Sequence, residues 1–425
     1  MSHLTNLQSR MKAGEVEAVL VSSEINQRYL TGLNYTDGYV LVLPEAAYLL
    51  ADFRYIEVAR ATAGSVGVEV VMPEGGMLPC VAGLLEKHAV RHLAYEEETV
   101  SCALRIRFAE TFPGVELMTG ASRLIDSLRL VKDADEIAFM TQAQKLTDDA
   151  FAHILNFITP ERTELEVALE LEFYMRAHGS EGTAFETIAV SGANSSKPHG
   201  VPGDRKLTPN AFFTMDFGAR WNGYCADMTR TVVLGKADDE MKRLYGTVLE
   251  AQTRAIESLH VGMPCCDADK VARDIIDNAG YKGCFGHSLG HGVGLYIHES
   301  PRLAASSPRE ITLQPGHVVT VEPGIYIAGK YGWCREHGGG KAAGGERIRG
   351  QNGHRRNACI PRTISGGGRR AVRGRQYLLK STQILLFAVP FRPSGWYTEG
   401  IAGKLRVRWV RDPRSRPQNK EDGFL

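Results

Sequence analysis

Two apolar runs joined by a short polar turn restrict the fold of this 425-residue chain more than any other feature. The runs FFTMDFGA and YCADMTRTVVL flank Trp221-Asn222-Gly223, and Asn-Gly is a strong signal for a β-hairpin. Each run carries one aspartate, Asp216 or Asp227, and the midpoint between them falls inside the turn. Symmetric pairing would place the two carboxylates opposite one another, with about 5 Å between Cβ atoms. Because facing like charges destabilise a sheet unless a cation lies between them, the hairpin favours a metal site over two exposed strand aspartates.

A glycine-rich segment further along contains three histidines within twelve residues, His287, His291 and His298. Imidazole binds transition metals and acts as a general acid or base near neutral pH, and glycine permits close backbone approach. A histidine alone is more often structural, so the grouping indicates a site. Glu322 ends the predicted strand HVVTVEP, where it is either a rigid ligand or base or a solvated glutamate before a turn. His199, in the loop KPHG, is open between a site residue and a solvated histidine.

The chain is long enough for two or three domains, and its hydrophobic fraction of 43% supports substantial cores. Residues 1–127 are predicted to form an α/β domain, and a charged stretch at 128–137 marks the boundary. Residues 133–332 form a second unit, so the whole chain is α/β (α+β). Apolar residues at helical spacing predict helices in this unit over 135–158, 164–179 and 239–259.

The composition changes after Gly332. Residues 333–425 contain 20 Lys or Arg and 6 Asp or Glu, a net charge of +14, whereas residues 1–332 carry −13. The tail is rich in Gly and Arg and has lost the apolar periodicity. We therefore expect residues 333–425 to be a basic tail without regular structure.

Three features bear on the compartment. No apolar run of about eighteen residues is present, so no transmembrane helix is expected. The start of the chain is polar and lacks the basic-then-apolar order of a secretory signal. Eight scattered cysteines without a C-x-x-C pair predict reduced thiols in a cytoplasmic protein.

The motifs MDFG, ADMTRT, HSLGHGVGLYIHESP and VEPG, in this order, resemble those of the pita-bread metallopeptidases. Within that superfamily the chain is most similar to the Xaa-Pro aminopeptidases and prolidases, over residues 1 to about 332. The resemblance implies a creatinase-type N-terminal α/β domain followed by a pita-bread catalytic domain. It also implies a homodimeric hydrolase that cleaves the Xaa-Pro bond of peptides with proline at the second position.

The resemblance further implies a centre of two divalent metal ions. Asp216, Asp227, His291 and Glu322 would bind the ions, and Glu322 would also be the general base for the attacking water. A ligand set rich in carboxylates favours manganese and accommodates cobalt, zinc or iron.

Three more histidines receive roles from the resemblance. His199 and His298 would hydrogen-bond the scissile amide and the tetrahedral intermediate. His287 would line the substrate pocket.

One ligand of the family pattern is missing from the sequence. The resemblance implies a further strand after VEPG, with a second glutamate that bridges both metals. Here the chain reads YGWCREHGGG, where Glu336 has no strand pattern around it. With one choice of codons for residues 333–340, reading one base later gives GVENMVV, a hydrophobic strand with a glutamate. We hypothesise a frameshift near Gly332 that leaves the catalytic domain incomplete at its C-terminal strands and impairs its activity.

Other functions stay open at this point. A catalytically inactive pita-bread homologue or a creatinase-like hydrolase is one alternative, although creatinase-like proteins lack the metal ligands that this chain keeps. Nucleic-acid binding through the basic tail is another, supported by its charge and disfavoured by its few, dispersed aromatic residues. The sequence does not separate an aminopeptidase from a dipeptidase.

Overall fold

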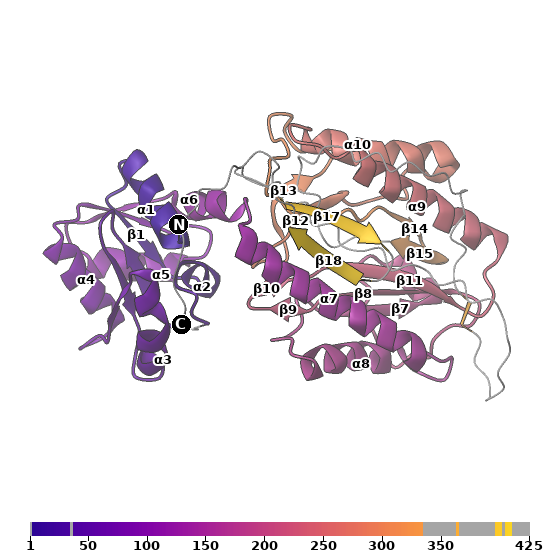
Figure 1. The fold of residues 1–425 in the computed structure, drawn as a ribbon, viewed down its shortest axis with the longest axis horizontal. Helices are drawn as coiled ribbons and strands as arrows, with labels where there is room; N and C mark the ends of the chain where they lie inside the picture. The colour runs from indigo at the N-terminus through magenta and orange to yellow at the C-terminus, as the bar shows by residue number, and fades with distance from the viewer. Residues whose placement is uncertain (1, 35–36, 335–362, 365–395, 402–403, 410–425) are drawn as a thin grey trace, which may run out of the picture.

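The N-terminal part of the chain is a mixed sheet of six strands, in the order β4-β3-β2-β1-β5-β6. The computed structural model describes residues 2–34, 37–334, 363–364, 396–401 and 404–409 (Figure 1). The strands are β1 (Ala18–Val21), β2 (Tyr39–Val42), β3 (Ala47–Leu50), β4 (Glu69–Val71), β5 (His92–Tyr95) and β6 (Glu116–Met118). The helices are α1 (His3–Ala13), α2 (Glu24–Thr31), α3 (Ile56–Thr62), η1 (Ala63–Val66), α4 (Met77–Lys87), α5 (Cys102–Thr111) and α6 (Ala121–Arg129).

Both faces of this sheet are buried, which explains why its central strands are apolar at every position. Val19 and Val21 of β1 pack in the cluster that includes α1, α2, α3 and α6. Leu20, between them, points to the opposite face, where α4 and α5 pack. Side chains alternate between the faces of a strand, so two covered faces require a continuous apolar run.

The C-terminal part is built around a second sheet, in the order β16-β11-β8-β7, with helices on both faces (Figure 1). Phe213, Met215 and Phe217 pack with α7 and α8, whereas Phe212 and Val233 pack with α9 and α10. The sheet strands are β7 (Ile188–Ser191), β8 (Phe212–Phe217), β11 (Met228–Leu234) and β16 (Thr363–Ile364). The helices are α7 (Ala134–Phe157), α8 (Glu164–Ala177), α9 (Asp239–Ser258) and α10 (Cys265–Ile276).

Short elements complete this part of the chain. They are η2 (Gly192–Ser196), β9 (Arg220–Trp221), β10 (Tyr224–Cys225), η3 (Asp277–Tyr281), β12 (Gly290–Gly292), β13 (Glu299–Leu303), β14 (Gly324–Ile327), β15 (Tyr331–Cys334), β17 (Trp396–Ile401) and β18 (Lys404–Trp409). One of them, β12, contains His291.

Capping side chains fix where the predicted helices begin. Asp133 caps α7 and Glu136 returns the bond to the Asp133 backbone, and Thr163 and Glu166 form the same reciprocal box on α8. The predicted helices over 135–158, 164–179 and 239–259 are confirmed within two residues at each end.

The mixed α/β architecture is confirmed, but one prediction about a strand is wrong. Residues 317–323 do not form a regular strand, although Val319 makes an isolated bridge to Gly292. The prediction that residues 333–425 lack regular structure stays untested, because the structure describes only a few of them. Strand β15 runs on to Cys334, and β16, β17 and β18 lie within the tail. The remainder of 333–425, including Glu336, lies outside the described residues.

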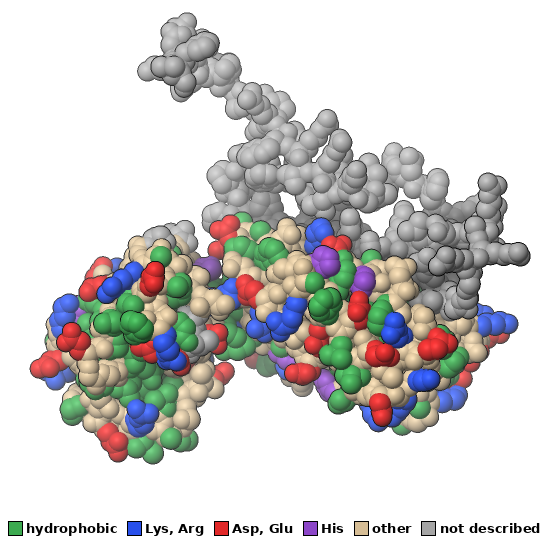
Figure 2. All heavy atoms as spheres, turned by 90° about the horizontal axis from the view of Figure 1, so that it is seen from below, with side chains coloured by type: hydrophobic (Ala, Val, Ile, Leu, Met, Phe, Trp, Pro, Cys, Tyr) green, Lys and Arg blue, Asp and Glu red, His purple; other side chains and the backbone are tan. Residues whose placement is uncertain are grey.

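The described surface mixes charges of both signs. Figure 2 shows Lys and Arg interspersed with Asp and Glu on one face of the molecule. Among the described helices, none has the length and apolar character needed to cross a membrane.

Candidate metal centre and active site

The Asn-Gly turn is confirmed, and it sets a different register from the predicted one. Asn222 and Gly223 have φ angles of 48° and 84°, as a two-residue turn of the primed type requires. Trp221 pairs with Tyr224 across this turn, and Asp216 therefore faces Thr229. The prediction that Asp216 faces Asp227 directly is wrong by two residues. Because two residues is one full repeat of a strand, both carboxylates still share a face and lie diagonally.

A second pair of segments brings His291 and Glu322 together. The Thr320 N–H donates to the His291 carbonyl at 2.8 Å, and the Glu322 N–H donates to the Leu289 carbonyl at 2.8 Å. The Thr320 hydroxyl accepts from the His291 N–H at 3.0 Å and donates to Glu322 Oε1 at 2.9 Å. These bonds give the segment around Glu322 a fixed register beside β12 without the regular strand that we predicted.

The structure places all four predicted ligands in one cluster. His291 Nε2 lies 3.2 Å from Glu322 Oε1 and 3.6 Å from Asp227 Oδ2. Asp227 and His291 are buried, at 5% and 6% exposure. Among the residues that the structure describes, Oδ1 of Asp216 is buried and has no hydrogen-bond partner. An unsatisfied buried carboxylate oxygen beside two further carboxylates is an arrangement that a bound cation would stabilise.

The electrostatics of the cluster lead to the same conclusion. Burial and the charges of Asp227 and Glu322 raise the pKa of Asp216 well above its ordinary value. Burial alone would lower the pKa of His291, but the carboxylates of Glu322 and Asp227 outweigh it and raise that pKa to about 9. Both raised pKa values mean that the metal-free cluster binds protons more readily than isolated groups do, which offsets its buried negative charge. Divalent cations would replace those protons, and the donor set of three carboxylates and one imidazole fits such ions.

The imidazole of His291 is oriented for binding through Nε2. Its Nδ1 lies 2.9 Å from the Gly292 carbonyl oxygen, and because a carbonyl only accepts, Nδ1 carries the proton and donates. This leaves Nε2 directed at the carboxylates. A backbone partner that fixes the tautomer in this way is usual for metal-binding histidines.

The other three histidines lie around the cluster at different depths. His298 is exposed, with its ring centroid 4.4 Å from that of His291. Partial desolvation of its ring and the charge of His291 lower its pKa, with smaller contributions from Arg302 and His199, so His298 is neutral near pH 7. His199 is exposed in the turn after η2. His287 is half-buried, and its Nε2 lies 3.2 Å from the Tyr326 hydroxyl.

The sequence prediction missed four residues that support the site. Thr320 links His291 to Glu322, as described above, and Tyr326 of β14 contacts His287. Asp269 and Arg273, one turn apart on α10, hold the segment before His291. Arg273 donates to the carbonyls of Phe285 and His287 at 2.7 and 2.9 Å, and Asp269 accepts from the Leu289 N–H at 3.0 Å. The sequence shows the helical spacing of Asp269 and Arg273. It does not show their partners, the backbone groups of residues 285, 287 and 289, which lie 12 to 20 residues away along the chain.

The described chain continues past the predicted break and returns to the site. Cys334 pairs with Gly324, and its thiol donates to the Glu322 carbonyl at 3.4 Å. Burial and the charge of Glu322 raise the pKa of the Cys334 thiol well above its usual value. Residue 334 therefore lies beside the carboxylates, and residues 335–362 lie outside the described part of the chain.

Comparison with known proteins identifies two regions. Residues 3–131 match the creatinase/prolidase N-terminal domain, and residues 138–351 match metallopeptidase family M24. The uncharacterized peptidase YqhT of Bacillus subtilis is 38% identical over 73% of this chain and 87% of its own length.

Two solved structures are similar to both parts of the chain. The Xaa-Pro dipeptidase from Bacillus anthracis is 39% identical, with a TM-score of 0.75 over 79% of this chain and 92% of its own. The X-Pro aminopeptidase from Thermotoga maritima is 33% identical, with a TM-score of 0.73 over 77% and 94%.

Proposed function

The chain belongs to metallopeptidase family M24, with a creatinase/prolidase N-terminal domain, and on this premise we propose that it hydrolyses Xaa-Pro bonds at the N-termini of peptides. The observation that carries the proposal is the convergence of Asp216, Asp227, His291 and Glu322 around the unsatisfied Oδ1 of Asp216. The similarity to a dipeptidase and to an aminopeptidase, both named for Xaa-Pro bonds, supports the substrate class.

These four residues would hold two divalent ions, of which manganese is the one we propose, with cobalt, zinc or iron as alternatives that the donor set accommodates. When bound, such ions lower the pKa of water and stabilise negative charge that develops on the substrate oxygen. The Thr320 hydroxyl and the Gly292 carbonyl hold Glu322 and His291 in place before any ion binds.

The remaining groups have roles that follow from their position. We assign Glu322 as the general base, because its carboxylate is partly exposed, at 18%, and can reach an attacking water. His298, neutral near pH 7, can donate a hydrogen bond to the scissile amide or to the oxyanion, with His199 nearby. His287, paired with Tyr326, would line the pocket that receives the substrate.

Hydrolysis of two kinds of peptide tests this function. The purified chain is loaded with Mn²⁺ and incubated with an Ala-Pro dipeptide and with an Ala-Pro-Ala-Ala tetrapeptide. We expect release of alanine from at least one substrate, and loss of this release in D216N. Cleavage of the dipeptide alone would assign a dipeptidase. Cleavage of neither, by a protein shown to contain metal, would contradict the proposal and favour a catalytically inactive homologue.

We also propose that the chain is impaired, because a frameshift near Gly332 removed a bridging glutamate. The Arg- and Gly-rich composition of residues 335–425 supports this idea. Without that glutamate the second of the two ions would be held weakly, so metal analysis of the purified chain should find fewer than two tightly held ions. Resequencing of the gene across codons 325–345 provides a direct test, because an uninterrupted reading frame there would rule the frameshift out.

The proposed setting is a cytoplasmic homodimer. The seven cysteines among the described residues are all free thiols, which suits a reducing compartment. Size-exclusion chromatography with light scattering would test the dimer.

A further inference from the structure

Two cationic side chains and one carboxylate are buried where the two parts of the chain meet. Arg129 at the end of α6 donates to Glu299 Oε1 at 2.8 Å, and Lys132 in the linker donates to Glu299 Oε2 at 2.8 Å. The side chains of Arg129, Lys132 and Glu299 are only 6%, 1% and 4% exposed. Burial alone would raise the pKa of Glu299, but Lys132 and Arg129 outweigh it and keep that pKa below its ordinary value.

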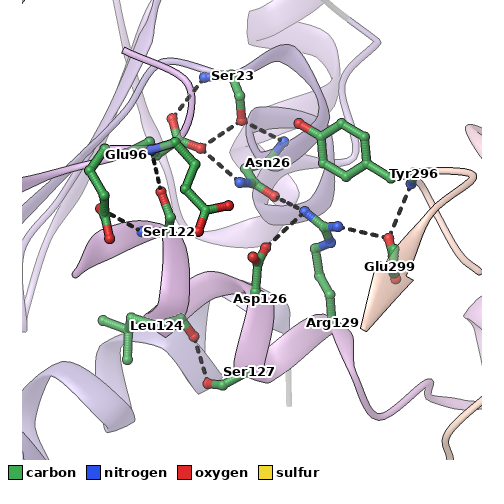
Figure 3. Close-up of polar contacts among 12 residues, drawn as sticks. Ser23, Asn26, Glu96, Ser122, Leu124, Asp126, Ser127, Arg129, Tyr296 and Glu299 are labelled. Atoms are coloured by element: carbon green, nitrogen blue, oxygen red, sulfur yellow. Dashed lines mark hydrogen bonds and ion pairs between the residues drawn. The ribbon is translucent and has the colours of Figure 1, made fainter. Parts of the chain in front are cut away.

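The same network continues into the N-terminal domain, as Figure 3 shows. Arg129 donates to Asn26 Oδ1 at 2.7 Å, and Asn26 donates in turn to Glu96 Oε1 at 2.7 Å. Ser23 binds both oxygens of Glu96 through its hydroxyl and its N–H. The position of the Arg129 guanidinium is therefore set by α2 and by the end of β5.

Glu299 connects this network to the candidate active site. It follows His298 directly, and its Oε1 accepts from the Tyr296 N–H at 3.1 Å, closing residues 296–299 into a tight turn. The Arg129 guanidinium lies 4.6 Å from the centroid of the Tyr296 ring. A Cβ at Gly294 would come within 2.6 Å of Glu299 Oε2, so the glycine makes room for this carboxylate.

We propose that Glu299 is a positioning residue for His298. Arg129 and Lys132 hold the Glu299 carboxylate, so that the N-terminal domain fixes the geometry of residues 293–299, the loop that carries His298. This inference rests on the role proposed for His298 above. Replacing a buried ion pair with apolar side chains is often neutral or stabilising, so stability alone does not require these charges at the junction. A carboxylate that is hydrogen-bonded between two cations holds the loop in one orientation. A catalytic imidazole needs a fixed orientation, because a displacement of 1 Å can lower the rate by roughly 100-fold.

The test uses the isosteric variant E299Q in the full chain loaded with Mn²⁺. We expect kcat to fall by roughly 100-fold with little change in KM, because a transition-state contact is lost. Amide hydrogen exchange in a peptide spanning residues 293–299 should become faster, and metal content should stay unchanged. The double variant E299Q/K132M removes one buried charge of each sign and should recover part of kcat.

The matched control is H3Q, which weakens a different contact at the junction of the two domains, the one between His3 and Asp133. His3 Nε2 lies 3.0 Å from Asp133 Oδ2 at the start of α7, and His3 Nδ1 lies 2.8 Å from the Tyr29 carbonyl oxygen, so these contacts do not involve Glu299. We expect H3Q to lower stability while kcat and exchange at residues 293–299 stay at the wild-type values. Equal losses of kcat in H3Q and E299Q would overturn the proposal, as would unchanged kcat and exchange in E299Q. If the wild-type chain cleaves no Xaa-Pro peptide, the proposed function fails, and the exchange comparison still decides whether Glu299 fixes the loop.

Discussion

The environment of the Asp216 side chain indicates a functional role, because an aspartate that only formed part of a strand would not need a buried carboxylate beside two others. Its carboxylate lies beside those of Asp227 and Glu322, and one of its oxygens is buried without a partner among the described residues. A folded protein keeps such a group only where something compensates it. We assign that compensation to a proton in the metal-free protein and to cations in the loaded one.

The variant D216N tests this assignment by calorimetry. An amide resembles the protonated carboxyl, so the metal-free variant should be at least as stable as the wild type. Mn²⁺ at 100 times the wild-type Kd should stabilise the wild type by about 2.7 kcal/mol and the variant by much less. Equal stabilisation of both proteins by Mn²⁺ would show that Asp216 is not a ligand.

His317 predicts a pH dependence of stability. It is 5% exposed, and its Nδ1 accepts from the Gln314 N–H, which requires the neutral ring. Burial and the charge of Lys132 lower its pKa to about 4. In the unfolded chain the pKa is about 6.5, so the unfolded state binds the proton more readily between these values. His317 therefore contributes stability that is complete above pH 6.5 and declines as the pH falls toward 4.

Urea denaturation of metal-free wild type and of H317Q at pH 7 and pH 5 measures this contribution. The free energy of unfolding should fall between these pH values by about 2 kcal/mol more in the wild type than in the variant. The same decrease in both proteins would contradict the prediction.

At the level of elements, the hairpin shows that the local sequence predicts the turn but not the register of the two strands. Asn-Gly predicted the turn correctly, since the turn needs two residues with positive φ. The register depends on which residues occupy the turn, and counting from the aspartates placed it two residues away. The error left both carboxylates on one face because side chains alternate with a period of two.

Helix α10 holds the histidine-rich segment through one partly buried pair, which yields a stability prediction. Arg273 donates to Asp269, which is 0% exposed. The variant R273M would leave that carboxylate without its cation, so we expect a loss of about 3 kcal/mol in the free energy of unfolding. Lys270 pairs with Asp274 at the same spacing but is 68% exposed, so K270M should cost much less. Chemical denaturation of both variants checks the difference, and similar losses would contradict it.

On the scale of the whole molecule, the N-terminal domain touches both segments that build the site. Glu299 follows His298, and Arg28 of α2 binds the tip of the hairpin that carries the two aspartates. The Arg28 guanidinium donates to both oxygens of Glu181 at 3.0 Å and to Asn222 Oδ1 at 3.3 Å. The two parts also share one apolar cluster, which includes Tyr224 and Leu295.

The variant R28A should therefore destabilise the chain by about 2 kcal/mol, since it removes hydrogen bonds to a charged partner at a partly buried junction. R54A is the matched control, because Arg54 pairs with Asp52 at 59% exposure and should contribute much less to stability. Thermal and urea unfolding of both variants measure the two losses. A loss in R28A no larger than that in R54A would show that this junction contributes little.

The sequence by itself determined the mixed α/β class, the main helices and the four candidate ligands, because these depend on local periodicity, turn chemistry and residue types at short spacing. The tertiary structure decided the diagonal placement of Asp216 and Asp227, the bond network of Thr320, the continuation of the chain to Cys334 and the buried network around Glu299. Arg129 and Glu299 lie 170 residues apart, so no local pattern relates them. Such contacts depend on how separate elements pack, and only the folded chain brings them together.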